Sequence, residues 1–173
     1  GLRPVSFHMK SIPDKYTPVL VVDDDEGLLL SIKATLVSSG LPEPALLSDS
    51  RQALEIVRKH SFQLILLDLM MPHLSGLEVL KKIKKESPDP ECVIVSASDE
   101  VATAVNAMHL GASNYLVKPL DSEKLVALVN RILEKHSLQE ELERFGRKKL
   151  FSELRQPQAF ADMIAADEAM AIV

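Results

Sequence analysis

The sequence predicts a doubly wound α/β fold, a five-stranded parallel sheet with five helices, and two observations support this prediction. Short apolar runs, typical of parallel strands covered on both faces, alternate with longer segments whose apolar residues recur three and four positions apart. The expected strands are 19–22, 45–47, 64–67, 93–95 and 114–117. The expected helices lie in 26–40, 50–60, 75–87, 99–111 and from 121 onwards.

Local signals mark several helix ends. Gly40 and Gly111 follow the first and fourth helical segments, where glycine commonly ends a helix. Ser50 and Ser75 stand at the start of the second and third segments, and each is expected to be the N-cap.

The composition predicts a soluble cytoplasmic protein that makes no disulfide. The chain has 173 residues, 46% of them hydrophobic, but its longest apolar runs are too short to span a membrane. The single cysteine, Cys92, lies in an apolar run and is expected to be buried. A net charge of −5 gives no general attraction for nucleic acid. Residues 1–8 are interpreted as an expression-vector remnant.

Polar residues stand where four of the expected strands end. They are Asp23–Asp25, Asp68, Ser96 and Lys118. In a doubly wound sheet the carboxyl ends of the strands share one edge, so these side chains are expected to converge. Clustered carboxylates are suitable ligands for Mg²⁺, and an aspartate among them can act as a nucleophile toward phosphorus. Lysine and serine can then hold phosphoryl oxygens.

Four stretches in this order resemble the receiver domain of two-component response regulators, which has a flavodoxin-like fold. They are "VLVVDDDEGLL", "LILLDLMMPHLSGLEVL", "VIVSAS" and "ASNYLVKPL", and the similarity spans about residues 17–136. The resemblance implies a phosphorylation-dependent switch that accepts a phosphoryl group from a sensor histidine kinase and is not itself an enzyme.

The resemblance also implies a metal site for Mg²⁺. By position, Asp23 and Asp24 are the acidic pair, with Asp24 a direct ligand and Asp23 acting largely through water. Asp68 is the phosphoacceptor and the second carboxylate ligand. The backbone carbonyl of Met70 completes the ligands from the protein, and Asp25 is not expected to be a ligand.

Three further positions carry roles by resemblance. Lys118 is the active-site lysine, and Pro119 after it implies a cis peptide bond. Ser96 is the switch hydroxyl, where threonine is common in the family, and Tyr115 is the switch aromatic residue. Met70 stands at a position that is often polar in the family and that affects the rate of dephosphorylation.

Two other classes fit the residues less well. A haloacid-dehalogenase-like phosphatase would use an aspartate directly after the first strand, a pattern that Asp23–Asp25 superficially fits. It would also need threonine or valine in place of Gly27, and it would leave Asp68 without a role. A flavodoxin-like binding module would need a phosphate loop where the acidic residues stand, and these would repel a phosphate.

The last helix is expected to open at Asp121 or Ser122, with Ser122 as its cap, and to continue into a linker helix at 137–155. Leu125, Leu128 and Ile132 form a first apolar stripe; Leu138, Leu142 and Phe145 form a second. The second stripe predicts a homodimer through an imperfect coiled coil, with a bend or register shift near 135–139. A solvated linker is the alternative.

Residues 156–173 are interpreted as the start of an output domain. "FADMIAADEAMAIV" resembles the opening of the AAA+ ATPase module of sigma-54-dependent transcriptional activators of the nitrogen-regulator-like class. Contacts with sigma-54 RNA polymerase and DNA would then belong to domains outside this sequence. A receiver with a different output domain is the alternative.

Overall fold

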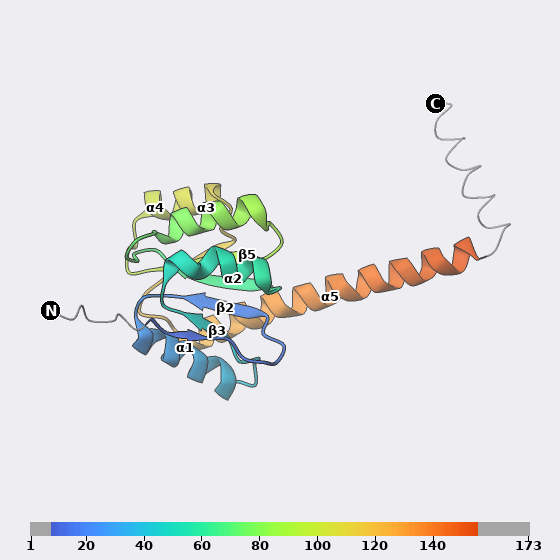
Figure 1. Cartoon of the computed structure of the whole chain (residues 1–173), viewed down its shortest axis with the longest axis horizontal. Helices are drawn as coiled ribbons and strands as arrows, with labels where there is room; N and C mark the ends of the chain where they lie inside the picture. Colours follow the sequence, from blue (N-terminus) through green and yellow to red (C-terminus); the bar gives the residue numbers. More distant parts are fainter. Residues whose placement is uncertain (1–7, 156–173) are drawn as a thin grey trace, which may run out of the picture. The chain divides into compact units, whose positions relative to one another are not determined.

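A six-stranded sheet forms the centre of the fold in the computed structural model, which describes residues 8–155 (Figure 1). Its strand order is β1-β3-β2-β4-β5-β6. The strands are β1 (Lys10–Ser11), β2 (Val19–Val22), β3 (Ala45–Leu47), β4 (Leu64–Asp68), β5 (Glu91–Ser96) and β6 (Asn114–Val117). The helices are α1 (Glu26–Ser38), the 3₁₀ helix η1 (Ser50–Gln52), α2 (Ala53–Lys59), α3 (Gly76–Glu86), α4 (Val101–His109) and α5 (Ser122–Leu154).

The five predicted strands are confirmed, and their pairing is parallel. β4 and β5 are longer than predicted, so Asp68 and Ser96 are their last residues rather than the residues that follow them. β1 was not predicted. It pairs antiparallel with β3 at the edge of the sheet, and two residues are too few to show a periodic pattern.

Helices cover both faces of the sheet. The buried apolar residues of α1 and α5 pack on one face, and those of α2, α3 and α4 pack on the other (Figure 1). The strand β6 is less buried than predicted: the side chain of Val117 is 43% exposed. The reason is that β6 is the last strand of the sheet. Cys92 is buried, as predicted.

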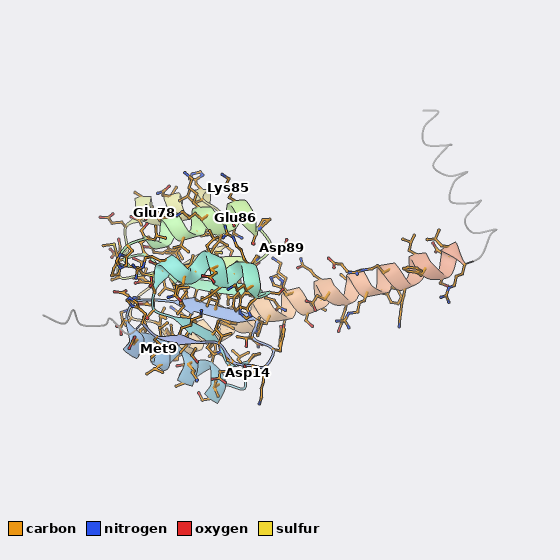
Figure 2. The ribbon with its side chains drawn as sticks, in the orientation of Figure 1. Met9, Asp14, Glu78, Lys85, Glu86 and Asp89 are labelled. Carbon is orange, nitrogen blue, oxygen red and sulfur yellow. The ribbon has the colours of Figure 1, made fainter. Side chains whose placement is uncertain are left out.

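The outer side of α3 is charged. Figure 2 shows Glu78, Lys85 and Glu86 along this helix, and all three side chains are exposed. The Arg58 guanidinium donates to both carboxylate oxygens of Glu86, at 2.7 and 2.8 Å, and so links α2 to α3. The lysine-rich segment 81–86 is therefore the solvated face of an amphipathic helix, with Ile83 directed into the core.

The predicted helix ends are partly correct. Gly40 and Gly111 adopt positive φ angles of 80° and 106°, the left-handed conformation that ends a helix. Ser75 caps α3 in a capping box with Glu78. The prediction for Ser50 is wrong: Asp49 caps the 3₁₀ helix that precedes α2.

The start of α5 also differs from the prediction. The Asp121 carboxylate accepts from the backbone N–H groups of Glu123 and Lys124, at 2.9 and 3.3 Å, so Asp121 rather than Ser122 acts as the cap. Aspartate and serine are both common helix caps, so the residue types alone did not distinguish the two positions.

The chain divides into two compact units, 1–133 and 134–173, with the division inside α5. In the first unit Leu125, Leu128 and Ile132 are buried, which confirms the first apolar stripe. Helical structure continues without a break through 135–139, so the expected register shift is not expressed as an interruption of the helix.

Two further predictions concern residues at the ends of the chain. Apart from His8, the expected vector remnant at 1–8 lies outside the described residues, as does the expected output-domain segment at 156–173. Within the described part, no helix has the length and apolar character that a membrane crossing would require.

We expect Gly76→Ala to destabilise the first unit by about 3 kcal/mol, because the added Cβ would lie 2.1 Å from the backbone oxygen of Asp68. Urea unfolding would measure the change in the free energy of unfolding. Gly146→Ala is the matched control, since a Cβ there meets nothing within 4 Å. Equal stability of the Gly76→Ala variant and the unmodified protein would contradict this packing account.

Candidate functional site

The predicted strand-end residues converge at one edge of the sheet. Asp23 directly follows β2, Asp68 ends β4, and Lys118 directly follows β6. The Lys118 Nζ donates to Asp23 Oδ2 at 2.9 Å and to Asp68 Oδ1 at 3.1 Å. These residues are 95 and 50 positions apart in the chain, and the shared direction of parallel strands brings them together.

Three carboxylates of this site could hold a metal ion together. Asp23, Asp24 and Asp68 each offer a carboxylate oxygen, and these oxygens lie within 4.8 Å of one another. Asp23 and Asp68 are buried, whereas Asp24 is exposed. A small set of oxygen ligands open to solvent on one side fits Mg²⁺, which keeps several waters and takes few protein ligands.

The surroundings of Asp68 raise the pKa of its carboxyl group to about 6. Burial is the main cause, and the negative charge of Asp23 adds to it; hydrogen bonding and attraction from Lys118 oppose both without cancelling them. Burial also lowers the pKa of Lys118, but its hydrogen bonds to Asp23 and Asp68 outweigh this, and the net shift is upward. One ammonium group thus faces three carboxylates, an excess of negative charge that would attract a divalent cation.

Asp25 lies next to the site but has a different role. Its carboxylate accepts from the Leu28 backbone N–H at 3.0 Å and so caps α1. Its own backbone N–H donates to Asp23 Oδ1 at 2.9 Å, which helps to orient that carboxylate. Asp25 is outside the group of three metal-competent carboxylates.

The two predicted switch residues are attached to one residue of the β5–α4 loop. Ser96 is fully buried, and its Oγ accepts from the backbone N–H of Ser98 at 3.0 Å. Tyr115, on β6, donates its hydroxyl to the backbone oxygen of Ser98 at 2.8 Å. The sequence offered no signal for Ser98, because both bonds go to its backbone atoms.

Met70 follows Asp68 by two positions in the loop between β4 and α3, and its side chain is 74% exposed. The Lys118–Pro119 peptide bond is cis, as predicted.

The structure joins Asp23, Asp24, Asp68 and Lys118 in one cluster. It places Ser96 and Tyr115 on the neighbouring strands β5 and β6.

This fold and this acidic site define a signalling module of two-component systems. The chain belongs to the response regulator receiver domain family, whose family model matches residues 19–130. Receiver domains generally bind Mg²⁺ at such an acidic pocket.

Curated relatives share this part of the chain. The sequence is 40% identical to the transcriptional regulatory protein ZraR of Escherichia coli K12 over 124 residues, which cover 71% of this chain and 28% of ZraR. It is 33% identical to the response regulator MprA of Mycolicibacterium vanbaalenii over 117 residues, which cover 68% of this chain and 50% of MprA. The chain thus spans about a quarter to a half of these relatives.

Solved structures agree with the family assignment. The receiver domain of NtrX from Brucella abortus matches with a TM-score of 0.62 and 30% identity, covering 67% of this chain and 98% of that domain. The receiver domain of Francisella response regulator 1452 matches with a TM-score of 0.65 and 29% identity, covering 68% and 97%.

We expect Asp68→Asn to raise the free energy of unfolding of the metal-free protein by about 2 kcal/mol at neutral pH. The pKa of Asp68 in the folded protein, about 6, lies above the ordinary aspartate value of 3.8, so ionisation of Asp68 destabilises the fold as the pH rises between these values. The gain should therefore shrink as the pH falls toward about 4.

Chemical unfolding in the presence of a chelator, at several pH values, would measure this gain. Asp89→Asn is a control, since Asp89 is an exposed aspartate outside the site. A gain that does not depend on pH would show that the charge of Asp68 is not its cause.

Proposed function

We propose that this receiver domain is a phosphorylation-dependent switch in which Asp68 accepts a phosphoryl group from a sensor histidine kinase. The observation that carries the proposal is the cluster itself, in which the Lys118 ammonium bridges the carboxylates of Asp23 and Asp68. A carboxylate nucleophile beside a cation that can move to the phosphoryl oxygens suits phosphoryl transfer.

In the transfer step an oxygen of Asp68 attacks phosphorus. The bond between phosphorus and the histidine nitrogen of the kinase breaks, and its electron pair remains on that nitrogen. Asp24, Asp68 and the carbonyl of Met70 would hold Mg²⁺, with Asp23 acting largely through water. When bound, Mg²⁺ would neutralise charge on the transferring oxygens. Lys118 would then pair with the phosphoryl group, because its ammonium already contacts Asp68 at 3.1 Å.

Phosphorylation would reach the surface through Ser98. When the Ser96 hydroxyl turns to donate to a phosphoryl oxygen, its bond from the Ser98 N–H is given up. Movement of the β5–α4 loop would also break the Tyr115–Ser98 bond and allow Tyr115 to rotate inward. The equilibrium would thereby shift between two conformations of the surface formed by α4, β6 and α5.

That surface already exposes apolar side chains around one groove. Val101, Val105 and Met108 of α4 and Val117 of β6 line it and are 43–77% exposed. We propose it as a second contact of the homodimer, in addition to the linker helix.

We propose that the linker helix at 137–155 pairs with its copy in a homodimer. Leu138, Leu142 and Phe145 are 60–72% exposed, so the helix has an apolar stripe that a second helix would cover. The pairs Glu140–Arg144 and Glu143–Arg147 lie at 3.9 and 3.5 Å and support the helix itself.

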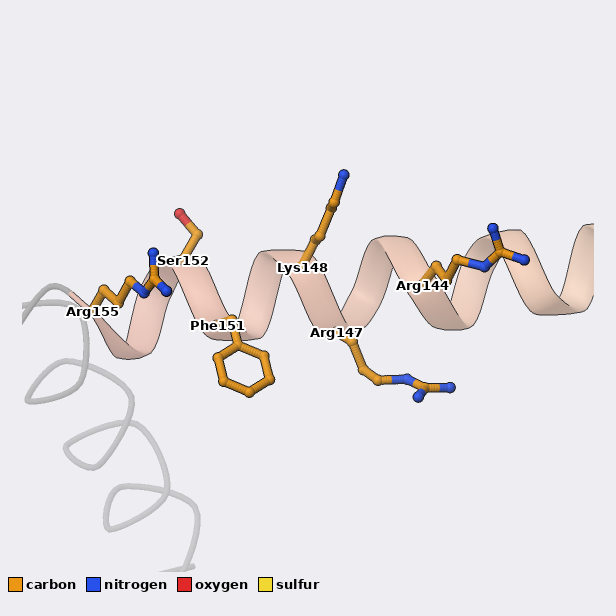
Figure 3. Close-up of a pocket in the computed structure, with 6 residues that line it drawn as sticks. All are labelled: Arg144, Arg147, Lys148, Phe151, Ser152 and Arg155. Carbon is orange, nitrogen blue, oxygen red and sulfur yellow. The ribbon is translucent and has the colours of Figure 1, made fainter.

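Towards its end this helix becomes basic around an exposed aromatic side chain. Figure 3 shows Arg144, Arg147 and Lys148 preceding Phe151, with Arg155 beyond it. Phe151 is 65% exposed, but it lies nine positions, about two and a half helical turns, after Leu142 and so faces away from the stripe proposed to pair. A solvated linker is the competing account, and the oligomeric state decides between them.

We propose a sigma-54-dependent activator as the output, on the resemblance of 160–173 to the opening of its ATPase module. The similarity to ZraR, a transcriptional regulatory protein, supports an output in transcription. The receiver sequence alone does not identify the output class. The match covers 28% of ZraR but 50% of MprA, so relatives with similar receivers differ in the length of the rest of their chains. Sigma-54 RNA polymerase and DNA would be contacted by domains beyond this sequence.

We expect Asp68→Asn to abolish labelling by a small phosphodonor in the presence of Mg²⁺, because the amide is not a nucleophile toward phosphorus. Intact-protein mass spectrometry would detect the added phosphoryl group. Asp25→Asn is the matched control, since this carboxylate is adjacent to the site but caps α1, and labelling should persist. Undiminished labelling of the Asp68→Asn variant would place the phosphoacceptor elsewhere.

We expect Leu142→Asp to convert the dimer to a monomer, because it places a charge in the centre of the exposed apolar stripe. Sedimentation velocity would measure the oligomeric state. Gln139→Asp is the comparison, since a strict heptad counted from Ile132 would put Gln139 at the seam instead. If Gln139→Asp alone dissociates the dimer, the register is wrong; if the unmodified protein sediments as a monomer, the pairing is wrong.

A further inference from the structure

The buried polar side chains of the described residues form two groups. They are Asp23, Asp68 and Ser96 in the phosphorylation site, and the consecutive residues Ser48, Asp49 and Ser50. The second group lies between β3 and α2 and has no part in the chemistry proposed above. Buried polar groups are costly unless they make hydrogen bonds, so the partners of this second group indicate its role.

Ser50 hydrogen-bonds to the loop that follows the phosphoacceptor strand. Its side chain is 3% exposed, and its Oγ donates to the backbone oxygen of Pro72 at 2.9 Å. The same oxygen accepts from the backbone N–H of Leu74 at 3.3 Å. A hydroxyl can donate and accept at once, and here both capacities are directed to one short stretch of loop.

This loop connects Asp68 to α3 and contains Met70. Its ends are held by backbone bonds, from Leu69 N to Val95 O at 3.1 Å and from Gly76 N to Leu69 O at 2.9 Å. Ser50, the first residue of η1, holds the middle of the loop at Pro72 and Leu74. The conformation of the segment after Asp68 therefore depends on a residue that precedes it by 22–24 positions.

The position of Ser50 is itself fixed by its two neighbours. The Asp49 carboxylate, in a side chain that is almost wholly buried, caps η1 by accepting from the backbone N–H of Arg51 at 3.0 Å. It also accepts from the Arg51 guanidinium, from Nε at 3.0 Å and from Nη2 at 2.8 Å. These hydrogen bonds lower the pKa of Asp49 although burial opposes the shift.

We propose that Ser50 is a positioning residue of the phosphorylation site, which holds the β4–α3 loop so that the Met70 carbonyl can serve as a metal ligand. This inference rests on the proposed function, in which Mg²⁺ binds at Asp24, Asp68 and Met70. The Met70 side chain is 74% exposed and lies two positions before Pro72, so the anchor at Pro72 restricts the backbone beside it. Groups that orient metal ligands typically alter metal affinity by about 10–100-fold when removed.

The test is a Mg²⁺ titration of the metal-free protein by calorimetry, with Ser50→Ala and Ser48→Ala compared. Ser48 is the matched control: it is also buried, at 7% exposure, but its Oγ donates to the backbone oxygen of Met9 and not to the loop. We expect Ser50→Ala to weaken Mg²⁺ binding about tenfold and Ser48→Ala to leave it unchanged. Thermal unfolding of the metal-free variants separates any general loss of stability from this effect.

Labelling of Ser50→Ala by a small phosphodonor should recover when Mg²⁺ is raised about tenfold, because the nucleophile Asp68 is unaltered. The positioning role would be overturned if Ser50→Ala bound Mg²⁺ as tightly as the unmodified protein. It would also be overturned if Ser48→Ala lost as much Mg²⁺ affinity as Ser50→Ala. If the unmodified protein itself binds no Mg²⁺, the proposed function fails instead.

If Ser50→Ala does not fold, the unmodified protein still decides the question. The Leu74 amide hydrogen should exchange slowly with deuterium, because it is bonded to Ser50 Oγ. At saturating Mg²⁺ this exchange should be about tenfold slower than in the metal-free protein. Ser50→Thr, which keeps the hydroxyl, should bind Mg²⁺ with the same affinity as the unmodified protein. An unchanged Leu74 exchange rate on Mg²⁺ addition would overturn the proposal.

Discussion

The excess of negative charge at the carboxyl edge of the sheet is the constraint on which the functional site depends. Asp23, Asp24 and Asp68 present oxygens within 4.8 Å of one another, and Lys118 is the ammonium group that contacts two of them. Burial prevents water from screening this charge fully, as the raised pKa of Asp68 indicates. Under the proposed function, Mg²⁺ would neutralise this excess charge, and a phosphoryl group on Asp68 would pair with Lys118.

The fold produces this cluster because parallel strands end at a common edge. β2 and β4 are neighbours in the sheet, so the residues at their ends, Asp23 and Asp68, are adjacent without any special turn. Lys118 follows β6, two strands from β4, and its long side chain crosses that distance. Helices on both faces bury the strands, and so the charges lie at the border of a fully apolar core.

Two loops flank the cluster, and a buried serine hydroxyl holds each of them. Ser96 binds the backbone of Ser98 in the β5–α4 loop, and Ser50 binds Pro72 and Leu74 in the β4–α3 loop. Their proposed roles differ. Ser96 can exchange its loop bond for a phosphoryl oxygen, whereas Ser50 lies outside the carboxylate cluster and would hold its loop throughout. A loop that must move and a loop that must stay in place would thus be anchored by the same chemistry.

The sequence alone determined the five parallel strands, the order of the site residues and the buried stripe of α5, because each depends on a local pattern of apolar residues or on the residue that ends a strand. Only the tertiary structure decided the roles of Ser50, Ser98 and β1. The local sequence around Ser50 predicts a helix cap, but its hydroxyl hydrogen-bonds to a loop 22–24 positions away. Ser98 is joined to Tyr115 across 17 positions through a backbone atom, and β1 is formed by pairing with β3. Such contacts join segments that are distant in sequence, so no local pattern encodes them.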